Sequence, residues 1–161
     1  MSVTTPGAIR TTIAARITAL TPGVDSSTPF REHDYELPLA EHAIADPAGC
    51  LRIFSVTEGA SIDGPDVTDG ATSEAVWQDF TVEVAYPTDI GSRYGDLRRV
   101  SLVNTISADR AQIAKTVGTN GTAYTDATVL TAPGGETRVD LGPVQLGIVQ
   151  LRVRYFRSAT P

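Results

Sequence analysis

The strongest constraint in this sequence is a run of alternating apolar and polar residues from Val76 to Tyr86. In an extended chain Phe80, Val82 and Val84 face one way, whereas the residues between them face the other way. A strand with one apolar face must bury that face against another layer of structure. The segment therefore predicts a β-strand that is stopped by Pro87 and lies in a layered fold.

Two further segments carry the apolar spacing of amphipathic helices. The first is expected over residues 6–20, and it begins at the capping hydroxyl of Thr5. The second begins at Asp96 and ends at Val117, with a break or kink expected at 104–107. The apolar stripe of the first helix consists of Ile9, Ile13, Ile17 and Leu20.

The other predicted strands are shorter or less regular. Strands are expected at Leu37–Leu39, at Cys50–Val56 and at Thr122–Thr131, the last followed by a turn at 133–135. In the final strand, the alternation of apolar residues changes parity near Gly147. That change predicts a bulge or bend at this glycine.

Two polar segments connect these elements. Residues 24–36 are expected to be a long polar connection, and residues 57–73 a long exposed loop rich in Gly, Pro, Asp, Ser and Thr. The element order shows no βαβ repeat. The sequence therefore predicts a single domain over 1–161 of the α+β class, with a mostly antiparallel sheet and two main helices packed on one face.

Composition limits the classes of function. Of the 161 residues 41% are hydrophobic and 20% charged, which is typical of a folded globular chain. The single cysteine, Cys50, excludes an internal disulfide framework and is expected to be a small core residue. No apolar run follows a basic segment near the first residue, so neither a secretory signal nor a lipid anchor is expected.

The residues that could carry catalysis form no recognisable constellation. His33 and His42 are nine residues apart, which does not place two imidazoles on one helical face, and both are expected to be loop histidines. Asp63, Asp66 and Asp69 recur every third residue, whereas an EF-hand loop needs acids at positions one, three and five. We therefore expect no catalytic residue, no metal ligand and no cofactor, with an enzyme that binds a metal among the aspartates as the weakest alternative.

Charge is segregated along the chain. Residues 25–79 hold 12 of the 19 acids and only two bases, a net charge of −10, and the remainder has a net charge of +4. Such segregation suits head-to-tail self-association, although an ordinary solubilising surface is an alternative. The candidate subunit-interface residues are Arg98, Arg99, Arg110, Arg138, Arg152, Arg154 and Arg157. The candidate acids facing a lumen or a tube are Asp63, Asp66, Asp69, Glu74 and Asp79.

Arg152 and Arg154 lie on one face of the last strand, opposite its apolar residues. Either this face is solvated, or the two guanidinium groups pair with carboxylates across a subunit boundary.

The order of elements resembles that of the tail terminator proteins of long-tailed bacteriophages. The resemblance rests on the opening helix with its isoleucines, the helix after Asp96, and three short motifs. These motifs are Trp77-Gln78, the strand Thr81 to Tyr86 with Val82-Glu83-Val84 before Pro87, and Arg152-Val153-Arg154-Tyr155.

The resemblance implies a structural virion protein with no enzymatic activity. Its subunits form a homohexameric ring that caps the tail tube and joins it to the head or neck. The implied partners are the tail tube protein and the head–tail connector or neck proteins, and DNA passes through the ring without specific binding. The implied location is the virion, after assembly in the host cytoplasm, with no membrane contact.

Two alternatives remain open. The chain is either another phage neck, tail-completion or tail tube subunit, or a non-viral acidic module that binds a basic protein. In the ring interpretation, acids of the 25–79 segment line the lumen, because an acidic wall repels the phosphate backbone and lets DNA slide.

Overall fold

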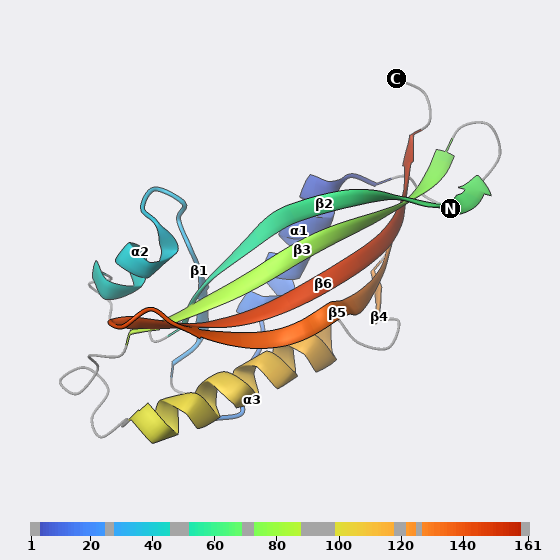
Figure 1. Ribbon diagram of the computed structural model, residues 1–161. Helices are drawn as coiled ribbons and strands as arrows, with labels where there is room; N and C mark the ends of the chain where they lie inside the picture. Colours follow the sequence, from blue (N-terminus) through green and yellow to red (C-terminus); the bar gives the residue numbers. More distant parts are fainter. Residues whose placement is uncertain are drawn as a thin grey trace.

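The structure is a computed structural model that describes residues 4–24, 28–45, 52–68, 73–87, 99–117, 122–124 and 127–158. Helices and strands make up the α+β class expected from the sequence (Figure 1). In chain order the elements are α1 (Pro6–Thr18), β1 (Phe30–Glu32), α2 (Leu39–Ala45), β2 (Arg52–Thr68), β3 (Ser73–Pro87), α3 (Arg99–Val117), β4 (Thr122–Tyr124), β5 (Ala127–Asp140) and β6 (Val144–Ser158).

The strands form one six-stranded sheet in the order β1-β2-β3-β6-β5-β4. Every neighbouring pair is antiparallel except β1 and β2, which are parallel and joined through α2. The expectation of no βαβ unit is therefore wrong, because the supposed polar connection at 24–36 contains β1. The strand expected at Leu37–Leu39 is also wrong, since the Pro38 carbonyl accepts the His42 N–H at 2.9 Å and a helix begins at Leu39.

The exposed loop expected at 57–73 is instead the far part of a long hairpin. β2 continues to Thr68 and β3 begins at Ser73, with register irregularities after Glu58 and after Asp63. Residues 57–62 are exposed. The polar side chains there remain in solvent, and the pairing of the two backbones satisfies the hydrogen bonding of the peptide groups. Composition alone therefore gave the wrong structure for this segment.

The turn expected at 133–135 also lies inside a strand. β5 runs through it, and the four residues between Thr131 and Glu136 lie opposite a single residue of β6. The strand expected over Thr122–Thr131 is divided into β4 and the first part of β5. The Pro-Gly-Gly segment therefore forms an irregularity within a longer strand and not a turn that ends a strand.

Two of the helices cover one face of the sheet, as the sequence predicts. α1 packs against β1 and β2, and α3 against β5 and β6. The Thr5 hydroxyl caps α1 by accepting the Ala8 N–H at 3.3 Å. α3 is one continuous helix, so the break expected at 104–107 is wrong. The core between these helices and the sheet includes Ile9, Ile13 and Ile17 of α1, Leu102, Ile106 and Ile113 of α3, and Phe80, Val82, Val149, Leu151 and Val153 of the strands.

The parity change near Gly147 has a different cause from the one expected. β6 pairs with β3 in unbroken register from Val144 to Ser158, so no bulge lies at Gly147. At this end of the sheet, α2 covers the face opposite α1 and α3. Val144 of β6 is buried there in a second cluster with Ala43 of α2, and both parities are apolar because both faces are covered.

Several predicted features lie outside the described residues. They are Cys50, the cap at Asp96, and the candidate site residues Asp69 and Arg98.

The close approach of α3 to β6 at Gly147 gives a stability prediction. A Cβ at this position would lie 3.1 Å from Cγ2 of Ile106 and 3.4 Å from Cε2 of Tyr86, both fully buried. Gly147→Val should lower the free energy of unfolding by about 1–3 kcal/mol through overpacking. Urea denaturation measures the change. Gly7→Ala is the control, because a Cβ there meets nothing within 4 Å, and it should raise stability by up to about 1 kcal/mol.

Candidate functional site

The sheet order turns the charge segregation of the sequence into a separation in space. The acidic segment 25–79 supplies β1, α2, β2 and the first part of β3, whereas most of the basic residues follow it in α3, β5 and β6. The boundary therefore falls where β3 lies beside β6. Head-to-tail association needs such a boundary between unlike surfaces.

Two ion pairs form along this boundary. Arg152 donates from Nε and Nη2 to the two Asp79 oxygens at 2.7 and 3.0 Å, and this hydrogen bonding raises the pKa of Arg152. Arg157 donates from Nε to Oε1 of Glu74. Two candidate interface arginines are thus paired with two candidate lumen acids inside one subunit.

One face of the sheet is left largely open by the described helices. We call it the open face; it is the face of β2, β3 and β6 turned away from α1 and α3, beyond the end covered by α2 (Figure 1). It mixes apolar, acidic and basic side chains, and Ile62 is 41% exposed. Its residues are Thr57 and Ile62 of β2, Trp77, Asp79, Thr81 and Glu83 of β3, and Ile148, Gln150, Arg152 and Arg154 of β6.

The other candidate arginines are held less completely. Arg138 donates to Gln145 Oε1 at 3.1 Å. The Nε atoms of Arg110 and Arg154 have no hydrogen-bond partner within the described part of the chain, and Arg154 stands 5.9 Å from the ring of Phe156. The side chain of Arg99 is outside the described set.

Two of the remaining candidate acids are placed only by their backbone. Asp63 lies opposite Val76 in the β2–β3 pairing, and Asp66 lies farther along β2. Their side chains are outside the described set, so their part in a lumen wall stays a prediction.

A buried polar cluster, unforeseen from the sequence, joins the sheet to α3. Arg52 of β2 donates to Asp109 Oδ2 of α3 at 2.5 Å, and both side chains are fully buried. The Tyr86 hydroxyl of β3 donates to the same oxygen at 2.8 Å. Arg52 also donates to the carbonyl oxygens of Thr28, at 2.7 Å, and of Val24. The side chains of Arg52, Asp109 and Tyr86 are all fully buried, so the cluster is structural; an arginine inside an apolar strand was its only sequence signal.

A second cluster brings together residues that the sequence analysis kept apart. His33 follows β1 in the connection to α2, as expected of a loop histidine, whereas His42 lies in α2, so that expectation is wrong for His42. Nε2 of His33 and Nδ1 of His42 lie 3.8 and 3.4 Å from Oδ1 of Asp34. The two imidazole rings are 5.1 Å apart between centroids.

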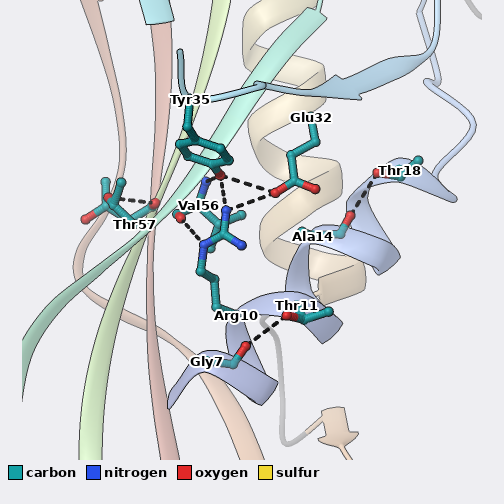
Figure 2. Close-up of polar contacts among 10 residues, drawn as sticks. Gly7, Arg10, Thr11, Ala14, Thr18, Glu32, Tyr35, Val56 and Thr57 are labelled. Atoms are coloured by element: carbon teal, nitrogen blue, oxygen red, sulfur yellow. Dashed lines mark hydrogen bonds and ion pairs between the residues drawn. The ribbon is translucent and has the colours of Figure 1, made fainter. Parts of the chain in front are cut away.

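Arg10 of α1 holds the turn that carries Asp34. Figure 2 shows the Arg10 side chain reaching from α1 to the Tyr35 hydroxyl and to the Glu32 carboxylate, the latter at 2.9 Å. Arg10 also donates to the Val56 carbonyl at 2.8 Å and lies 4.8 Å from the Tyr35 ring centre. Tyr35 has a φ of 65°, a left-handed conformation that such contacts must hold in place.

A scan against protein-family models and a search of curated proteins find no match for this chain. In the part of the chain that the structure describes, no helix has both the length and the apolar character needed to cross a bilayer.

The buried cluster predicts a pH dependence of stability. Burial, and next the charge of Asp109, raise the pKa of Tyr86 well above its ordinary value of 10.0. Below about pH 10 the tyrosine is protonated in both states, and above it only the unfolded chain ionises, so its contribution to stability is lost as pH rises toward the folded pKa.

Tyr86→Phe should therefore be less stable than the parent chain by about 1–3 kcal/mol at pH 7, because Asp109 loses a hydrogen bond. The gap should narrow above pH 10, since phenylalanine cannot ionise. Urea denaturation from pH 7 to 11 measures both effects. If the difference in unfolding free energy between the parent chain and Tyr86→Phe stayed constant from pH 7 to 11, the raised pKa of Tyr86 would be contradicted.

Proposed function

We propose that this chain is a structural subunit of a bacteriophage head–tail junction, of the tail terminator type, and that copies of it close into a ring, of six in the family it resembles. In this role it is not an enzyme; it caps the tail tube and joins it to head or neck proteins. The observation that carries the proposal is the charge boundary along β3 and β6, which divides one sheet into an acidic and a basic half.

The boundary favours a ring over a symmetric dimer. A two-fold interface sets the same patch against itself, which would place acidic surface against acidic surface or basic against basic unless it straddled the boundary. A head-to-tail contact instead sets the basic half of one copy against the acidic half of the next. Repeating that contact with a closing rotation produces a ring.

Arg154 of the open face is the best placed arginine for this contact. Arg152 already has a bidentate partner in Asp79, so it orders the open face within the subunit. Arg154 is partly exposed and holds no such pair among the described residues. Its Nε is buried, so a carboxylate from a neighbouring copy would pair with the exposed part of the side chain.

The acidic half then has a second use in the ring. Glu83 of the open face and the acids of the β2–β3 hairpin would face the lumen or the tube, where negative charge repels the phosphate backbone of passing DNA. In the assembled particle the ring would lie in the virion tail or neck, after assembly in the host cytoplasm.

Sedimentation velocity and negative-stain electron microscopy of the concentrated protein test the proposal. The expected result is a closed ring that dissociates as ionic strength rises, because salt screens contacts between surface charges. Arg154→Glu should weaken the assembly by about tenfold per contact, which is about 1.4 kcal/mol.

Lys115→Glu is the matched control for Arg154→Glu. It makes the same change in net charge at an exposed position in the last turn of α3, away from the open face. A protein that stays monomeric at high concentration, and that does not cap isolated tail tubes, would favour the alternative of an acidic protein-binding module.

A further inference from the structure

The imidazole nitrogens of His33 and His42 that face Asp34 are buried without a hydrogen-bond partner in the described part of the chain. The His33 side chain is 6% exposed and that of His42 14% exposed. Buried polar atoms in folded proteins nearly always have a partner, so an unpaired pair of nitrogens pointing at one carboxylate needs an explanation.

The three groups converge on one point. One potential ligand atom from each of His33, Asp34 and His42 lies within 4.8 Å of the other two. Because metal bonds of roughly 2.0–2.2 Å at tetrahedral angles place ligand atoms roughly 3.4 Å apart, the 3.4 Å between Asp34 and His42 already fits an ion. The 3.8 Å between His33 and Asp34 requires only a small closing movement.

We propose that His33, Asp34 and His42 bind a divalent first-row transition metal, with Zn²⁺ as the reference ion. Two imidazoles and one carboxylate are ligands of zinc, whereas Ca²⁺ and Mg²⁺ prefer oxygen ligands throughout. Three protein ligands leave a fourth position for water or for a group from another molecule. Asp34 is 53% exposed, so that position opens toward solvent.

The surrounding structure preorganises this site. Asp34 Oδ1 accepts the Glu36 N–H at 3.0 Å, and the contacts of Tyr35 with Arg10 hold the same turn. The backbone N–H of His33 donates to the Phe54 carbonyl at 2.7 Å and so continues the β1–β2 pairing. On the other side, burial of Ala43 fixes α2 and with it His42. A bound ion would cross-link the end of β1 to α2.

The test uses protein prepared without a polyhistidine tag and stripped of metal with a chelator. The chain has only two histidines, so ¹⁵N spectra of the imidazoles report each ligand separately. Titration with ZnCl₂ should shift Nε2 of His33 and Nδ1 of His42 together and saturate at one ion per chain. Competition with a chromophoric chelator should show Zn²⁺ binding at least about 100-fold tighter than Mg²⁺.

Asp34→Asn and His42→Gln should each weaken Zn²⁺ binding by about 100-fold or more, since each removes one of three ligands. Asp140→Asn is the matched control and should bind like the parent, because Asp140 likewise accepts a backbone N–H two residues on, at 2.9 Å from Gly142, and lies outside the cluster. Circular dichroism checks that each variant is folded.

Two results would overturn the proposal. One is the absence of any imidazole shift at equimolar ZnCl₂, which needs no variant and so does not depend on how the substitutions fold. The other is an affinity that Asp34→Asn leaves unchanged, since that carboxylate is exposed and its loss leaves the fold intact. Neither result depends on whether the chain assembles into rings.

Discussion

The fully buried ion pair between Arg52 and Asp109 fixes the arrangement of this fold. Displacing either partner of a buried ion pair leaves an uncompensated charge, which strongly destabilises the fold, so the pair favours one placement of α3 over the sheet. Arg52 also holds the carbonyls of Thr28 and Val24, which sets where the chain leaves α1 and enters β1. The contacts of Arg52 in β2, which Asp109 of α3 holds in place, therefore set the position of β1 and, through it, that of α2.

α1 and α3 cover one face of the sheet, so the surface available for contacts on the sheet depends on how much of the other face is covered. α2 is only seven residues long and covers one end of it. The remainder presents both signs of charge in register, with Asp79 opposite Arg152 where the acidic part of the chain meets the basic part. The same topology that satisfies the core thus places acidic and basic residues side by side on this face, and the proposed ring would use that arrangement.

The sequence predicted those elements whose signal is local and failed where a distant segment supplies the structure. Residues 76–86 and the helix capped by Thr5 carry their own periodicity, and both were found. Residues 57–68 are extended only because β3 pairs with them, which no composition reveals. The parity change at Gly147 was visible, yet its cause was a helix on the far face. The sequence spacing gave no reason to place His33 near His42, because only the connection from β1 to α2 brings the two side chains together.

The two edges of the sheet bear on how copies meet. β1 and β4 are each three residues long, and β1 is followed by the Tyr35 turn. Beyond them, the outer edges of β2 after Phe54 and of β5 after Val129 have no neighbouring strand among the described residues, so these edges are open to pairing by a strand of another molecule. The ring contact proposed for the open face and the charge boundary is separate from the connection between β1 and α2, where the two histidines lie.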